Sequence, residues 1–133
     1  MDKKLTHLEM IQGVVNRMGT NSFLLKGWTI TLVAALFALA QKESNSAYMF
    51  LAYFPAIIFW GLDGYYLWQE KLFRKLYDKV RTMNESDIDF SMSTTSVSKE
   101  AGSFIDAILS RTVLPFYGVV VLAILFVIYI SSR

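Results

Sequence analysis

Three apolar segments, each long enough to cross a lipid bilayer, constrain this chain more than any other feature of its sequence. They span residues 23–40, 47–68 and 113–130. The third carries no charged residue, and the other two carry one each, Lys26 and Asp63 respectively. A transmembrane helix needs about 20 predominantly apolar residues, because it rises about 1.5 Å per residue through a hydrocarbon core about 30 Å thick. The sequence therefore predicts an all-α integral membrane protein with three transmembrane helices.

Composition agrees with this prediction and narrows the chemistry. Apolar residues make up 54% of the chain and charged residues only 18%, against roughly a quarter charged in soluble domains. The chain has no cysteine, which excludes disulfides and thiolate ligands, and its one histidine, His7, is expected to be exposed, with no partner for general-base chemistry. No nucleophile, base and orienting group converge in the pattern. We therefore expect neither an enzyme nor a metal or cofactor site.

Residues 1–22 are predicted to form an amphipathic helix, in the cytoplasm or on the membrane surface, because five apolar residues recur at three- and four-residue spacing. These residues are Leu5, Leu8, Ile11, Val15 and Met18. The polar residues 19–22 are expected to break this helix and to cap the next one. A transmembrane hairpin then covers 23–68, and Pro55 is expected to kink its second helix.

The segment 69–112 is the one long loop, and the third transmembrane helix follows it over 113–133. The second span is predicted to continue into the loop as a basic helix to about residue 82. A polar linker then covers 83–97, where its acidic residues are expected to be solvated. Ser98 is a candidate cap for a second helix over 98–112. Three apolar linker residues alternate with polar ones and allow a short strand: Ile88, Phe90 and Met92.

Lysine and arginine counts set the expected orientation. With three spans, the N-terminus and the 69–112 loop share one side of the membrane. That side carries eleven of the thirteen Lys and Arg residues, and the other carries only Lys42 and Arg133. Short segments rich in Lys and Arg stay in the cytoplasm. The N-terminus and the long loop are therefore predicted to be cytoplasmic, and the C-terminus is predicted to lie outside.

Asp63 is the most informative single residue, since a carboxylate within a span costs at least ~2.5 kcal/mol and usually faces protein or water. Along an antiparallel hairpin, Lys26 and Asp63 both lie about 21–24 Å below the loop over 41–46. Two interpretations remain open. Either Asp63 and Lys26 line a polar pore in an oligomer, or they form an ion pair within one subunit near the inner interface.

The basic residues of the cytoplasmic helices also have two interpretations. Together with an aromatic side chain, they are candidates to bind a nucleotide or oligonucleotide through phosphate contacts and stacking. Alternatively, they form a juxtamembrane flank that lies against anionic lipid. The candidate ligand residues are Arg17, Lys71, Arg74, Lys75, Lys79, Arg81 and Tyr77.

Several stretches of the chain carry a family resemblance, which covers roughly residues 5–80. They include LTHLEMIQ at 5–12, NSFLLKGW at 21–28 and FWGLDGYYLWQE at 59–70. These stretches resemble a family of small bacterial inner-membrane proteins found near nucleotide-signalling and antiviral defence genes, in particular the membrane channels of the Hailong defence system. The final span matches that family only in hydrophobicity.

The resemblance implies a homo-oligomeric channel, a tetramer, that acts as an effector of antiphage defence. A cytoplasmic nucleotide or DNA oligomer, made by a partner nucleotidyltransferase, would open the channel and depolarise the inner membrane. Asp63 would then be a pore residue, and the basic helices would form the ligand site. Two alternatives stay open: an adaptor that anchors a cytoplasmic partner through residues 1–22 and 69–82, and a holin-like membrane-disrupting toxin.

Overall fold

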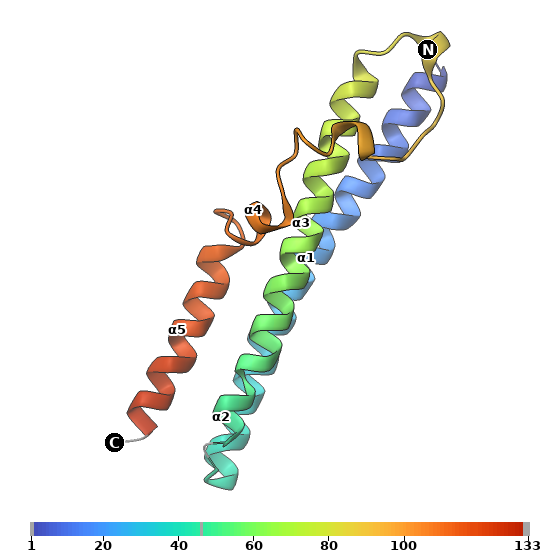
Figure 1. The fold of residues 1–133 in the computed structure, drawn as a ribbon. Coiled ribbons are helices and arrows are strands. Elements are labelled where there is room, and N and C mark those ends of the chain that lie inside the picture. The colour runs from blue at the N-terminus through green and yellow to red at the C-terminus, as the bar shows by residue number, and fades with distance from the viewer. Residues whose placement is uncertain (1, 46, 132–133) are drawn as a thin grey trace.

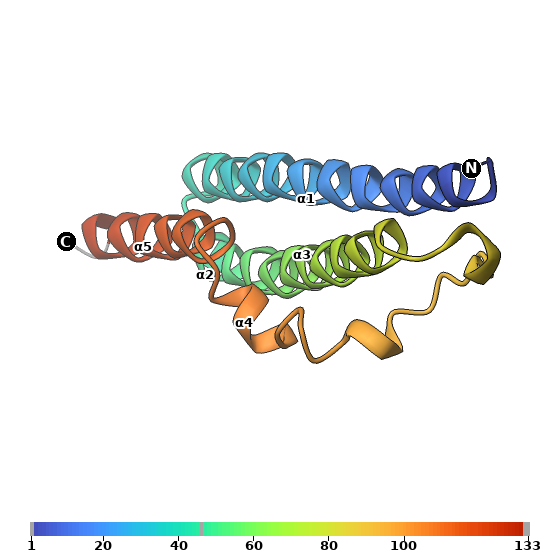
Figure 2. The ribbon, with the colours of Figure 1, turned by 90° about the horizontal axis from the view of Figure 1, so that it is seen from above.

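The computed structural model describes residues 2–45 and 47–131. Over these residues the chain forms five α-helices and two short 3-10 helices, with no strand. Three helical segments are long and apolar enough to cross a membrane. Helices α1 and α3 run antiparallel and side by side, and α5 lies beside the half of this pair that is remote from the N-terminus (Figure 1; Figure 2). The predicted all-α class with three candidate spans is confirmed at this level.

Helix α1 is one continuous helix over Asp2–Glu43, about 63 Å long at 1.5 Å per residue. The expected break at 19–22 is therefore wrong. Ser22 does not cap a new helix, because its hydroxyl donates a hydrogen bond across to Asp63 of α3. A glycine such as Gly19 costs a helix interior about 1 kcal/mol, which extensive packing of α1 against α3 offsets.

The second candidate span consists of α2 over Ala47–Leu51 and α3 over Tyr53–Arg81. The two helices are separated at Ala52, three residues before Pro55. Proline has no backbone N–H, so the carbonyl of Leu51 loses the donor that would continue the helix. Helix α3 extends well past the apolar segment to Arg81, as predicted.

The chain between α3 and the last helix is mostly irregular. Residues 83–101, here called the strap, contain the 3-10 helices η1 over Glu85–Asp87 and η2 over Thr95–Val97. The expected strand does not form within the strap, and the expected helix over 98–112 is replaced by the five-residue α4 over Phe104–Ile108.

Ser103 is the cap that starts α4, in place of the predicted Ser98. The Ser103 hydroxyl accepts a hydrogen bond from the Asp106 N–H, and the Asp106 carboxylate accepts one from the Ser103 N–H. This reciprocal pair is a capping box. Ser98 instead ends η2 and donates its hydroxyl to the carbonyl of Thr95 at 3.0 Å. Gly102, whose φ of +82° favours glycine, makes the preceding turn.

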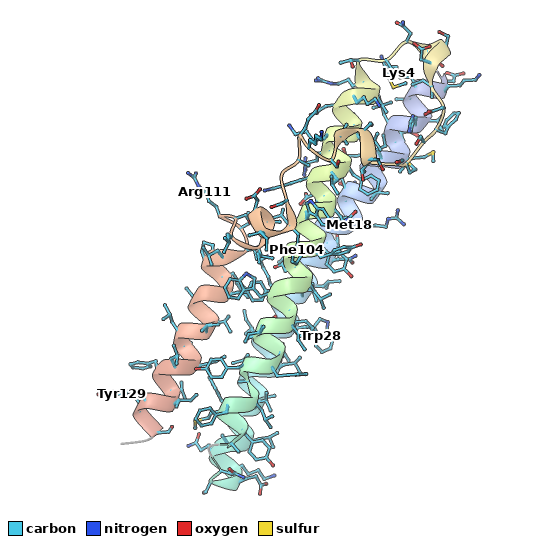
Figure 3. All side chains as sticks on the ribbon, viewed as in Figure 1. Lys4, Met18, Trp28, Phe104, Arg111 and Tyr129 are labelled. Atoms are coloured by element: carbon cyan, nitrogen blue, oxygen red, sulfur yellow. The ribbon has the colours of Figure 1, made fainter. Side chains whose placement is uncertain are left out.

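Helix α5 covers Leu114–Ser131, close to the predicted third span. It is the most apolar and the least enclosed of the three candidate spans, with only Tyr117 and Ile124 buried. Tyr129 is 58% exposed and lies on the outer side of α5, away from the other helices (Figure 3). Such exposure of large apolar side chains is the pattern of a helix that faces lipid.

Two apolar cores hold the fold together. The span core joins Val33 of α1, Ala52 and Ala56 beside the α2–α3 kink, and Ile124 of α5. The stalk core lies in the polar half of the molecule, which we call the stalk and define as residues 2–20 of α1 with 69–81 of α3. The stalk core consists of Ile11, Leu76 and Val80 of the stalk, together with Val97 of the strap. Leu8, Ile11 and Val15 of the predicted apolar face are thus covered by other parts of the fold, whereas Leu5 at its start is 59% exposed.

Candidate functional site

The most polar buried point lies where the stalk meets the candidate spans. The Lys26 Nζ of α1 lies 2.6 Å from Asp63 Oδ2 of α3, and it donates a second hydrogen bond to Ser22 Oγ at 2.9 Å. The Ser22 hydroxyl donates in turn to the other oxygen of Asp63. The Asp63 side chain is fully buried, whereas that of Lys26 is 23% exposed. The three side chains form a closed polar cycle, which we call the Asp63 centre.

Helix periodicity explains why these residues meet. Ser22 and Lys26 are four residues apart and lie on one face of α1. Next to Asp63, Gly64 lets α4 come close, because a Cβ at this position would lie 2.1 Å from Ile108 Cγ2. A larger side chain at this position would push α4 away from α3.

Helix α5 covers the Asp63 centre with Tyr117, which is fully buried. The Tyr117 ring stacks on Trp60 with the ring centroids 6.2 Å apart. Its hydroxyl is within electrostatic reach of Thr29 and Asp63 but makes no hydrogen bond of good geometry with the described residues. The neighbouring Phe116 ring faces Lys26, whose Nζ lies 5.9 Å from the ring centroid.

The two predicted pore residues are therefore brought together, in the geometry of the ion-pair interpretation. Within this protomer the pair is neutralised internally, and Asp63 does not reach the surface. Ser22 was expected only as a helix cap, and Tyr117 was not singled out at all. The four-residue spacing from Lys26 was a usable signal for Ser22. Tyr117 had no such signal, because its place depends on how α5 packs.

The predicted ligand residues do not form one cluster. Arg17 and Arg81 are exposed, on α1 and near the end of α3. Arg74 pairs with Glu70 on its own helix at 2.9 Å, beside a hollow between α1 and α3. Lys71 lies in the electrostatic field of Asp106 near α4. Tyr77 packs half-buried against the stalk core.

Lys75 and Lys79 lie four residues apart on one face of α3, and the strap passes beside them. They line one open hollow of about 450 Å³ with Glu100 and Ser96. Lys79 Nζ donates a hydrogen bond to Ser96 Oγ at 2.9 Å. Lys79 also lines a second cavity of about 350 Å³ beneath the strap, which includes Asp89 and His7. Both hollows are mixed in charge, because the acidic residues of the strap lie beside the basic residues of α3.

His7 is buried rather than exposed, which corrects the expectation from the sequence. Its side chain is 1% exposed, and its Nε2 lies 2.8 Å from the carbonyl oxygen of Ser91. A carbonyl oxygen only accepts, so Nε2 carries the hydrogen. The ring also packs against Phe90, with the centroids 5.7 Å apart. The partner residues come from the strap, more than eighty positions away, so the local sequence around His7 gave no sign of them.

Glu85 is a second strap residue with a structural role that the sequence did not indicate. Its carboxylate accepts hydrogen bonds from the backbone N–H groups of Lys3 at 2.8 Å and of Lys4 at 3.3 Å. Free N–H groups and the helix dipole make this end of α1 a favourable place for an acidic group. Two contacts therefore hold the strap against the start of α1. Glu85 binds the backbone of Lys3 and Lys4, and the Ser91 carbonyl binds His7.

Comparison with known proteins adds no relative: no protein-family model, no curated protein and no solved structure matches this chain.

Proposed function

We propose that this chain is the subunit of a homo-oligomeric ion channel in the bacterial inner membrane, with its N-terminus and strap in the cytoplasm and its C-terminus outside. Three helical segments of sufficient length and hydropathy support the insertion, and eleven of thirteen basic residues on one side support the orientation. The family resemblance supports a tetramer and a role as an antiphage effector that depolarises the cell when it opens.

One observation carries the proposal: α1 and α3 each run without a break from the candidate spans into the polar stalk. Stiff helices transmit a displacement along their length. The Asp63 centre lies on the contact between these two helices, at the junction of stalk and span. A ligand that shifts α1 against α3 in the stalk would therefore act directly on the Lys26–Asp63 pair.

The proposed ligand is a cytoplasmic nucleotide or oligonucleotide, made by a partner nucleotidyltransferase. Lys75 and Lys79 are its best-placed phosphate contacts, because they share one open hollow. Lys79 donates to the neutral hydroxyl of Ser96 in this conformation, so phosphate binding would exchange a hydrogen bond to a neutral acceptor for one in which both groups are charged. That exchange would loosen the strap from α3.

The pore role of Asp63 requires that its pair with Lys26 opens. While the pair is closed, the two charges cancel within one protomer. Separation of the two helices would present a free carboxylate at the inner mouth of the pore, where it would attract cations. The closed pair thus corresponds to the resting channel.

The test combines oligomer size in detergent with ion flux through liposomes that contain the purified protein. We expect an oligomer that conducts after addition of a DNA oligomer. Cation selectivity should fall in Asp63→Asn and in the Asp63→Asn, Lys26→Met double variant, and it should be unchanged in Glu9→Gln, an exposed stalk position of α1. The double variant guards against misfolding of the single one. A monomer without conductance would overturn the channel proposal.

A membrane adaptor is the second candidate, because the stalk has apolar side chains that the described residues leave exposed. Leu5 is 59% exposed and Met10 is 42% exposed, both on α1. A protein partner would bury them. An adaptor would give no ion flux, and Leu5→Ser would abolish recruitment of its partner to membranes without affecting insertion.

A further inference from the structure

The segment between the strap and α5 exposes an apolar face at an unusual place. We call residues 102–113 the elbow; they contain α4. Ile105 is 57% exposed and Leu109 is 55% exposed, and their four-residue spacing puts them on one side. Ala107 is fully buried, and Ile108 packs against Gly64 of α3. The elbow is thus amphipathic, with its inner side on α3 and its apolar outer side uncovered.

Contacts with α3 hold the elbow in this orientation. Trp60 Nε1 donates a hydrogen bond to the Ile108 carbonyl at 2.8 Å, and Trp68 Nε1 donates one to the Gly102 carbonyl at 3.2 Å. The Phe104 ring meets Trp68 edge to face, with the centroids 6.1 Å apart. Because these contacts hold both ends of α4, the fold itself keeps Ile105 and Leu109 exposed.

Two independent lengths place the elbow at one boundary of the apolar layer. Helix α5 starts at Leu114, directly after the elbow, and its 18 residues extend about 27 Å. From Gly64, which α4 contacts, back to Ala47 is about 26 Å along α2 and α3. Both lengths approach the hydrocarbon thickness of about 30 Å. Tyr65 and Trp68 lie at the same level, as aromatic residues do at a membrane interface.

Charge at the elbow favours an anionic partner. Arg111 follows Leu109 by two residues, is exposed, and points away from the helices (Figure 3). Lys71 of α3 is half-buried and lies close enough to α4 to act on the Asp106 carboxylate. The one acidic elbow residue, Asp106, is engaged in the capping box with Ser103. An apolar surface with an exposed cation beside it fits phospholipid with an anionic headgroup.

We propose that the elbow is an interfacial anchor for anionic phospholipid of the inner leaflet. Ile105 and Leu109 insert between the acyl chains, and Arg111 binds the headgroup phosphate. The inference rests on the proposed membrane insertion. Its consequence is that lipid holds α4 in place against Gly64, directly beside the Asp63 centre.

The test uses nitroxide labels on single cysteines, which the cysteine-free chain permits. Labels at Ile105→Cys and Leu109→Cys are compared with Leu122→Cys in α5 and Gln12→Cys in the stalk, in vesicles of phosphatidylcholine and phosphatidylglycerol. We expect the elbow labels to be accessible to oxygen and protected from a water-soluble nickel chelate, at a shallower depth than position 122. Position 12 should be accessible to the chelate.

Each contrary result has its own meaning. Elbow labels as accessible to the chelate as position 12, with position 122 deep in lipid, would overturn the anchor and leave the membrane proposal intact. Chelate access at position 122 as well would overturn insertion itself. Elbow labels that neither probe reaches would indicate burial against a second copy, which also overturns the lipid anchor.

The headgroup contact is tested with Arg111→Gln against Lys99→Gln, a matched loss of one exposed cation from the strap. Native mass spectrometry gives the preference for bound phosphatidylglycerol over phosphatidylcholine. Arg111→Gln should lower this preference about fivefold, the equivalent of ~1 kcal/mol per basic residue near an anionic surface. Lys99→Gln should leave it unchanged. An equal effect of both substitutions would contradict a headgroup site at Arg111.

Discussion

Substitution of Gly64 by alanine tests how closely α4 packs against α3 beside the Asp63 centre. In Gly64→Ala, the new Cβ would lie 2.1 Å from Ile108 Cγ2 and 3.2 Å from Ile108 Cα, whereas ordinary carbon contacts are about 3.5–4.0 Å. The Ile108 side chain can rotate, but its backbone is held by the hydrogen bond from Trp60. Overpacking of this kind costs about 1–3 kcal/mol.

Gly61 is the matched control, because it lies on the same helix with nothing within 4 Å of its added Cβ. Gly61→Ala should gain up to about 1 kcal/mol from helix propensity. Gly64→Ala makes the same gain and bears the overpacking cost. We therefore expect Gly64→Ala to be less stable than Gly61→Ala by about 1–3 kcal/mol.

The assay is denaturation of both variants in one detergent, followed by far-ultraviolet circular dichroism. A third substitution, Ile108→Ala, removes Cγ2 and should reduce the cost of Gly64→Ala, leaving only the contacts with the Cα and Cβ of residue 108, both at 3.2 Å. Equal stability of the two glycine variants would refute the close approach of α4. An unchanged cost in the Ile108→Ala background would refute Ile108 as its cause.

Three further predictions follow from the site and the strap. Asp63→Asn should lower the free energy of unfolding by about 3–5 kcal/mol, because it leaves the Lys26 charge without its partner. Adding Lys26→Met should recover most of this loss. Equal stability of the single and double variants in denaturation would contradict a stabilising ion pair. His7→Ala leaves the buried Ser91 carbonyl without its donor, so strap opening should become about 1–3 kcal/mol easier and trypsin should cut faster after Lys99, with Gln12→Ala as the unaffected control. Hydrogen bonds from the Ser103 backbone and side chain lower the pKa of Asp106 below its ordinary value of 3.8. The ionised Asp106 carboxylate therefore stabilises α4 above pH 3.8, and this stabilisation is lost as the pH falls through the lower pKa of the folded state. The chemical shift of the Ser103 amide proton, followed by NMR, should report this titration. A midpoint at or above 3.8 would contradict the lowered pKa of Asp106.

Sequence alone determined the parts of this protein that depend on local chain properties. The three candidate spans follow from apolar runs whose lengths match a bilayer, and helices satisfy their own backbone hydrogen bonds there. The extension of α3 to Arg81 follows from continued helical periodicity. The meeting of Lys26 and Asp63 was also within reach, because the rise per residue is fixed and a short loop sets the register of the hairpin.

Tertiary structure decided the features that need distant partners. Residues 19–22 carry break signals, yet α1 passes through them, because packing against α3 outweighs the weak propensities of glycine and serine. His7 is buried by a strap more than eighty residues away. Tyr117 covers the Asp63 centre only because α5 packs beside α3, and no spacing within one helix encodes that contact. A single sequence specifies local periodicity strongly, whereas contacts between distant segments are set by the packing of the whole fold.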